Sequence, residues 1–122
     1  MKARAVCGFL ALCSVGCGED RTPVACAAYA AAGLGVSVSN ATTGSPICDA
    51  AVTASEGPYS EQLSGNACTF SGAYERPGTY VIRAMRQGFH PSEIAAVRVV
   101  MGSGECPHVE QARVTVPLTP EG

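Results

Sequence analysis

The 122-residue sequence contains no tryptophan, and aromatic residues make up only 6% of it. Its core must therefore consist mainly of Val, Ile, Leu and Ala, and so small a domain gains from covalent cross-links. Lysine is absent after Lys2. Without Lys2 and Arg4 the chain carries six Arg against ten acidic residues, a formal charge of about −4. This balance argues against a nucleic-acid partner, because such binding depends on a basic surface.

The sequence also lacks an apolar run long enough to cross a bilayer. Its longest, residues 5–15, has about 11 residues, whereas a membrane-spanning helix needs about 20. The run follows the basic residues Lys2 and Arg4. A basic start followed by a short apolar segment predicts a secretory signal peptide.

The end of this segment, Ser14-Val15-Gly16-Cys17, resembles the lipobox of bacterial lipoproteins. The resemblance implies a signal peptide over residues 1–16, lipid on Cys17, and a tether and lead-in over residues 17–32. The protein would then be attached to a membrane of the cell envelope through the lipid on Cys17, since acyl chains anchor a protein stably.

Two alternatives concern this anchor. Gly18 after the lipidated cysteine is no obvious retention signal, which favours the outer membrane over the inner one. An ordinary signal peptide cut near Gly16 or Ala25 would instead leave no lipid.

From residue 33 onward, the pattern predicts short strands separated by Gly- and Pro-rich turns. The clearest strand follows the Pro77-Gly78 turn, and its alternation places Tyr80 on the core face and Arg83 on the solvent face. Residues 24–32 are expected to be extended, because nine uncapped residues make a marginal helix. The expected strands cover residues 33–40, 48–55, 59–63, 68–70, 79–85, 93–101 and 110–118. The positions expected to face the core are Leu34, Val36, Val38, Tyr80, Ile82, Ala84, Val97, Val99, Met101, Ala112, Val114, Val116 and Leu118.

This spacing of strands, without a helical pattern, predicts an all-β fold with a single β-sandwich. Pro117 and Pro120 lie in and after the last expected strand. Because proline cannot donate a backbone hydrogen bond, this strand is expected at an edge of its sheet.

Cys7 and Cys13 are assigned to the leader and Cys17 to the lipid, which leaves four cysteines. An even number of cysteines is expected to pair in an oxidising compartment. If the chain reverses at Gly57-Pro58, antiparallel pairing places residue i opposite about 116 − i. This register puts Cys48 opposite Cys68, within disulfide reach. The two remaining cysteines would tie the lead-in to the last strand. Four cysteines still allow three connectivities, and buried free thiols are the alternative. The expected bridges are Cys48–Cys68 and Cys26–Cys106.

The segments 44–53, 68–74 and 77–84, followed by Gly88-Phe89, resemble the carboxypeptidase regulatory-like domain. The resemblance covers about residues 33–118 and places the domain at 33–122. It implies a seven-stranded antiparallel, transthyretin-like sandwich of the Ig-like type. That domain accompanies peptidases, receptors and adhesins as an accessory module, so the resemblance implies no catalytic residue.

The residues themselves also argue against catalysis. Ser103 lies in a predicted strand–strand loop and not in the strand-to-helix elbow of a hydrolase. Cys106-Pro107-His108 would supply half of a metal site, with His90 or Asp49 completing it, but the cysteines are better used in bridges. We therefore expect no cofactor and no enzyme activity.

The sequence thus predicts a lipid-anchored, non-catalytic envelope module with a structural or protein-interaction role. Tyr59 and Tyr74 flank predicted turns and are candidates for stacking on a sugar or a partner protein, the alternative being that they pack over hairpin ends. A carbohydrate- or peptidoglycan-binding module is the second hypothesis.

Overall fold

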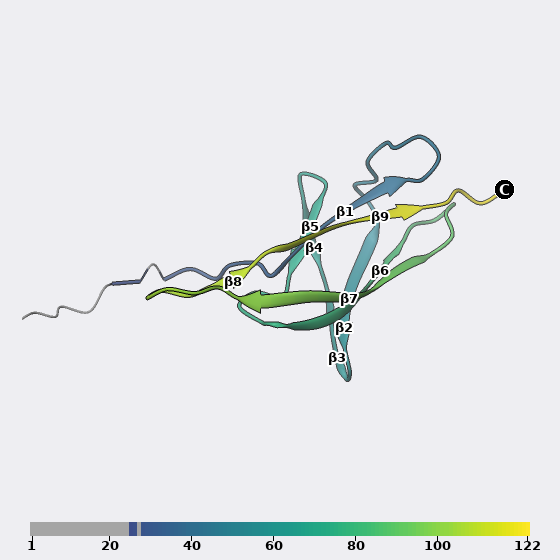
Figure 1. Ribbon diagram of the computed structural model, residues 1–122. Coiled ribbons are helices and arrows are strands. Elements are labelled where there is room, and N and C mark those ends of the chain that lie inside the picture. Colours follow the sequence, from purple (N-terminus) through teal and green to yellow (C-terminus); the bar gives the residue numbers. More distant parts are fainter. Residues whose placement is uncertain (1–24, 27) are drawn as a thin grey trace, which may run out of the picture.

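The computed structural model describes residues 25–26 and 28–122 (Figure 1). The described chain consists of nine strands and their connections, without helices. This part of the chain therefore contains no helix long and apolar enough to span a membrane. The strands are β1 (Leu34–Asn40), β2 (Ala51–Glu56), β3 (Tyr59–Gln62), β4 (Ser64–Asn66), β5 (Thr69–Gly72), β6 (Gly78–Met85), β7 (Ser92–Met101), β8 (Val109–Glu110) and β9 (Ala112–Leu118).

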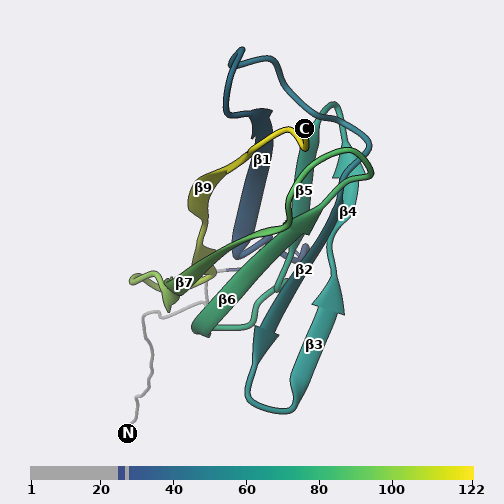
Figure 2. The same cartoon turned by 90° about the vertical axis from the view of Figure 1, so that its right-hand side faces the viewer.

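The strands form two sheets that pack face to face, which confirms the predicted all-β sandwich (Figure 2). One sheet has the order β4-β5-β1-β9 and the other the order β3-β2-β6-β7-β8. The predicted number of seven strands is wrong, because the short strands β4 and β8 add to those expected. Strand β9 lies at the edge of its sheet, as its proline predicted.

The expectation of antiparallel pairing throughout is also wrong. Strands β1 and β9 pair in parallel, from Leu34 opposite Ala112 to Asn40 opposite Leu118. The reason is the path of the chain between the sheets. It leaves β8, crosses at Gln111, and enters the other sheet at the end where β1 begins, so β9 must run in the same direction as β1.

The core lies between the sheets and follows the predicted alternation. Tyr80, the residue chosen to mark the core face of β6, is completely buried. Met101 is the exception, because its side chain is 47% exposed where β7 extends beyond the core and pairs only with β8. Ala112 and Val114 are only partly buried against the core. The remaining predicted core positions are buried, namely Leu34, Val36, Val38, Ile82, Ala84, Val97, Val99, Val116 and Leu118.

A β-bulge in β7, not expected from the sequence, sets the orientation of this strand. Tyr80 pairs with Val97, but two residues further along β6, Ile82 pairs with Ile94. The extra residue lies at the bulge, where Ala96 has a φ of 61°. Because of the bulge, Ile94 and Val97 both pack toward the core although three positions separate them.

The sandwich has two ends that matter for function. At the lead-in end, residues 25–26 and 28–33 lie beside the turn before β6, the end of β7 and the loop 102–108. At the far end lie the loops 41–50 and 86–91 and the C-terminus. Figure 1 shows the lead-in end at the left and the C-terminus at the right.

Candidate functional site

Both predicted disulfides are present. The Cα atoms are 4.4 Å apart in Cys48–Cys68 and 5.4 Å apart in Cys26–Cys106. Two disulfides are typical of a protein that resides outside the cytoplasm.

The geometry used to predict Cys48–Cys68 is nevertheless wrong. The β2–β3 hairpin does turn at Gly57-Pro58, but its ladder ends with Thr53 opposite Gln62, so neither cysteine belongs to it. Cys48 lies in the connection that leads from β1 to β2, and Cys68 lies in the turn between β4 and β5 of the other sheet. The bridge therefore links a crossover loop to the tip of a hairpin at the far end.

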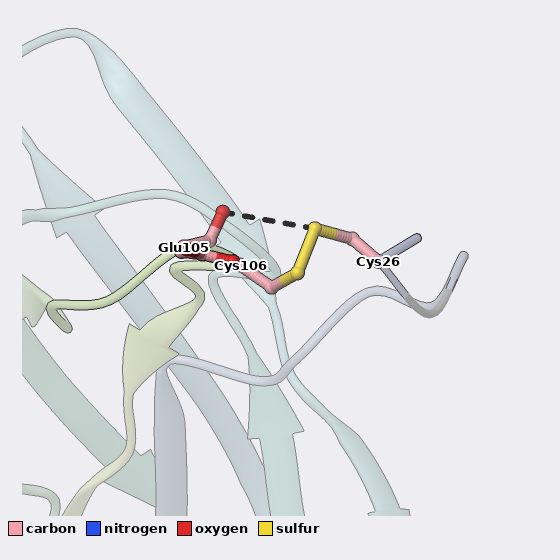
Figure 3. The surroundings of a disulfide bond; sticks show 3 residues. All are labelled: Cys26, Glu105 and Cys106. Carbon is pink, nitrogen blue, oxygen red and sulfur yellow. Dashed lines mark hydrogen bonds between the residues drawn. A yellow bond between two sulfur atoms is a disulfide. The ribbon is translucent and has the colours of Figure 1, made fainter. Parts of the chain in front are cut away.

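The second bridge holds the lead-in against the domain. Figure 3 shows Cys26 on the lead-in joined to Cys106, with the Cys26 Sγ 3.7 Å from the carbonyl oxygen of Glu105. The described residues 25–26 and 28–32 form neither helix nor strand. Further along, the Glu75 N–H donates to the Ala31 carbonyl at 3.0 Å.

The Glu75 carboxylate is the second attachment point of the lead-in. Its Oε2 accepts the Ala31 N–H at 2.8 Å and is hydrogen-bonded to His108 Nδ1, and its Oε1 accepts the Val109 N–H at 3.2 Å. The hydrogen bond from His108, followed by those from the two backbone N–H groups, lowers the pKa of Glu75 from its ordinary value. Tyr29 stacks on the His108 ring with 4.2 Å between the centroids.

The structure places the two candidate tyrosines differently. The Tyr59 hydroxyl donates to Glu61 Oε1 at 2.6 Å, which raises the pKa of Tyr59, and the Arg76 guanidinium lies 3.6 Å above its ring. Tyr59 thus packs over the hairpin end, and its face is covered. Tyr74, in contrast, is 52% exposed. No ring stacking joins the two tyrosines in the described part of the chain.

The metal half-site considered from the sequence is not assembled. Cys106 is in a disulfide near His108 at the lead-in end, whereas His90 and Asp49 lie at the far end. Among residues 25–26 and 28–122, no three His, Cys, Asp or Glu side chains are grouped as metal ligands. Ser103 lies in the loop 102–108. The lipidation candidate Cys17 lies outside the described residues.

A surface hollow that was not predicted lies at the far end. It has a volume of about 590 Å³. Its lining includes Asp49, Met85, Arg86, Gln87, Phe89 and Glu121. Two loops and the C-terminal segment thus contribute to it. The two loops meet because β2 and β6 pair at Ala51 and Met85 and bring the residues beside these positions together.

An ion pair with two hydrogen bonds forms the polar wall of this hollow. Arg86 Nε donates to Asp49 Oδ1 and Arg86 Nη2 donates to Asp49 Oδ2, both at 3.0 Å. These hydrogen bonds lower the pKa of Asp49 and raise the pKa of Arg86. Asp49 remains largely exposed and Arg86 moderately so, so both retain surface that a ligand can contact.

Backbone hydrogen bonds fix the opposite wall. Gly88, at a φ of 89°, allows the loop to turn, and the Phe89 N–H donates to the Arg86 carbonyl at 3.0 Å. The His90 N–H donates to the Thr119 carbonyl and the Glu121 N–H to the Gly88 carbonyl, both at 2.9 Å. The C-terminal segment therefore braces the loop that carries Phe89. The Gly88-Phe89 pair was the sequence signal for this loop.

Comparison of the sequence with protein-family models and with curated proteins finds no match.

Proposed function

We propose that this protein is a non-catalytic, lipid-anchored module of the cell envelope that presents its far end to a partner protein. One observation carries the proposal. The chain that leads from Cys17 enters the fold at the lead-in end and is fixed there by Cys26–Cys106, whereas the Asp49–Arg86 hollow lies at the opposite end. An anchor at one end leaves the hollow directed away from the membrane.

The character of the hollow suits a protein or peptide partner. A paired carboxylate and guanidinium lie beside the thioether of Met85, which is 44% exposed, and the half-buried ring of Phe89. Protein interfaces commonly combine such an apolar centre with a polar rim, and arginine, methionine and aromatic residues are enriched in them.

We further propose that the sandwich is of the transthyretin-like type found in carboxypeptidase regulatory-like domains. Supporting this, the segments that carry the resemblance are structurally coherent. Residues 77–84 open and form the central strand β6, and Gly88-Phe89 forms the loop at the hollow. Such domains are accessory modules, consistent with a role without catalysis.

The anchor is tested by the intact mass of the protein isolated from its native membranes. We expect a lipid-modified mass for a chain that begins at Cys17, and four thiols that react with an alkylating agent only after reduction. A mass without lipid would refute the anchored module.

The interaction role is tested by photo-cross-linking in native membranes from position 85, beside the hollow, and from position 37 on the exposed face of β1. We expect a discrete adduct with an envelope protein from position 85 only. Arg86→Ala should abolish it, whereas Arg83→Ala, which removes another exposed arginine three residues earlier on β6, should not. An adduct that survives Arg86→Ala would argue against the hollow as the binding site.

The carbohydrate-binding alternative has weaker support. The Tyr59 ring is covered by Arg76, and Tyr74 has no second free ring stacked beside it in the described chain. Titration with soluble cell-wall glycans, followed by tyrosine emission, distinguishes the two functions, because a glycan-binding module would give a saturable change.

A further inference from the structure

Most of the large apolar side chains that the described residues expose are at the lead-in end. Tyr29 and Tyr74 are 59% and 52% exposed, and Val100 and Met101 are 38% and 47% exposed. Met85, at the far end, is the fifth member of this class. We name Tyr29, Tyr74, Val100 and Met101 the lead-in surface.

Contacts through His108 and its neighbours place these four side chains on one end of the molecule. Tyr29 stacks on His108, and Tyr74 precedes Glu75, whose carboxylate is hydrogen-bonded to His108 and to the Val109 N–H. Val109 in turn is opposite Met101 in the β7–β8 pair, and Val100 is opposite Glu110. The exposed apolar groups therefore lie at the same end of the molecule.

A shallow hollow extends this surface across the neighbouring strands. It has a volume of about 440 Å³ and is lined by Pro77, Gly78 and Thr79 on one side and by residues 98–101 on the other. The lead-in surface thus continues from the loops onto the start of β6 and the end of β7.

We propose that the lead-in surface lies on the lipid bilayer and inserts its side chains at the headgroup level. This inference rests on the proposed lipid anchor. Cys26 is nine positions after Cys17, which corresponds to a reach of at most about 30 Å for a fully extended chain. A flexible chain of this length has an average span of about 16 Å. The anchor therefore holds this end of the domain close to the membrane.

The bridge turns this proximity into an orientation. Because Cys26 is covalently fixed to Cys106, the tether ends at the lead-in surface and not at a mobile segment. Tyrosine is enriched at membrane–water interfaces, where its ring contacts the acyl boundary and its hydroxyl stays hydrated. The two exposed tyrosines suit that position, and the methionine and valine add apolar contact.

The charges around the surface define the kind of membrane. Glu105 and Glu110 are exposed beside it, and Arg98 on β7 and Arg113 at the start of β9 are exposed cations. Glu56 is paired with Arg76, and Glu75 with His108. Since these charges give no excess of cations and the chain from Cys17 onward carries a formal charge of about −4, the lead-in surface fits a zwitterionic bilayer better than an anionic one.

The test uses the absence of tryptophan from the chain. Tyr74→Trp places a single fluorescent reporter on the lead-in surface, and Met85→Trp places one at the far end as a matched control. The full-length lipidated proteins are reconstituted into phosphatidylcholine vesicles with and without a nitroxide-labelled headgroup. We expect the Tyr74→Trp emission to be quenched at least about threefold more strongly, because interfacial side chains lie about 5–10 Å into the headgroup boundary.

Two further measurements complete the test. Val100→Ser with Met101→Ser, added to Tyr74→Trp, should reduce the quenching, and vesicles with anionic lipid should reduce it as well. Equal quenching of both reporters in protein whose mass shows the lipid would overturn this inference and leave the anchor intact. A blue-shifted Tyr74→Trp emission without quenching, together with a dimeric mass, would overturn it in favour of a second copy of the chain. A mass without lipid would identify failure of the proposed anchor itself.

Discussion

Glu75 and His108 lie 33 residues apart in the sequence, and the hydrogen bond between His108 Nδ1 and Glu75 Oε2 joins the turn before β6 to the loop before β8. The same carboxylate accepts the Ala31 N–H. One side chain thus connects three segments at the end where the chain enters the domain. The arrangement makes the docking of the lead-in dependent on the ionised form of Glu75.

Glu75→Gln should therefore destabilise the protein more at pH 7 than at pH 3. The pKa of Glu75 is lowered on folding, so its stabilising effect is complete above its ordinary pKa of about 4.5 and is lost as the pH falls through the lower value of the folded state. Urea unfolding of the wild type and the variant at both pH values measures the difference. An equal loss at both values would show that Glu75 acts through packing and not through its charge.

A second carboxylate provides the comparison. Glu93 Oε2 accepts a hydrogen bond from Arg83 Nη1 at 3.0 Å, but both side chains are about half exposed. Glu93→Gln should therefore change the free energy of unfolding at pH 7 by less than about 0.5 kcal/mol, because exposed ion pairs contribute little.

Removing the two disulfides should have unequal effects. Cys26→Ser with Cys106→Ser opens a loop of 80 residues, and loop-closure entropy predicts that the free energy of unfolding falls by about 4.5 kcal/mol. Cys48→Ser with Cys68→Ser opens a loop of 20 residues and should lower it by about 3.3 kcal/mol. Chemical unfolding of the two double variants measures both values. A loss below about 1 kcal/mol for the first pair would show that the lead-in contributes little to the fold.

Tyr80→Phe should destabilise the domain by about 1–2 kcal/mol, because it removes hydrogen bonds at a buried residue. The Tyr80 hydroxyl donates to the Arg76 carbonyl at 2.7 Å and accepts from Arg76 Nη1 at 2.9 Å. These hydrogen bonds hold Arg76 over the Tyr59 ring. Tyr74→Phe is the control and should change stability by less than about 0.5 kcal/mol, since Tyr74 is exposed. Equal losses in the two variants would contradict this role of the Tyr80 hydroxyl.

The parts of the fold that were predicted correctly depend on local signals. Pro77-Gly78 opens β6, and the alternation that follows identifies Tyr80 as a core residue without reference to any other strand. That the four cysteines form two bridges followed from their even number and the expected compartment, whereas the choice of partners was based on a hairpin register that does not reach Cys48 or Cys68. Strands β4 and β8 have three and two residues, too few for alternation to be visible.

The missed features depend on contacts between distant segments. Asp49 and Arg86 are 37 residues apart and meet only because β2 pairs with β6 in one particular register. The parallel pairing of β1 with β9 likewise depends on the end at which the chain re-enters the sheet. Neither register nor re-entry is encoded in the composition of one segment, so the far-end hollow could not be predicted.

Ala96→Gly should stabilise the protein by about 0.5–1 kcal/mol. The substitution removes a steric cost of about 1–2 kcal/mol, which a residue with a Cβ atom has in the left-handed region. The greater conformational entropy of glycine in the unfolded chain offsets only part of this gain. Ala96 occupies this region at the bulge, with a φ of 61°. Ala95→Gly is the matched control. It changes the adjacent exposed alanine, whose φ is not positive, and should destabilise the protein by about 0.5–1 kcal/mol. Opposite signs for two identical substitutions at neighbouring positions would establish the bulge, whereas a loss of stability in both variants would show that β7 continues without it.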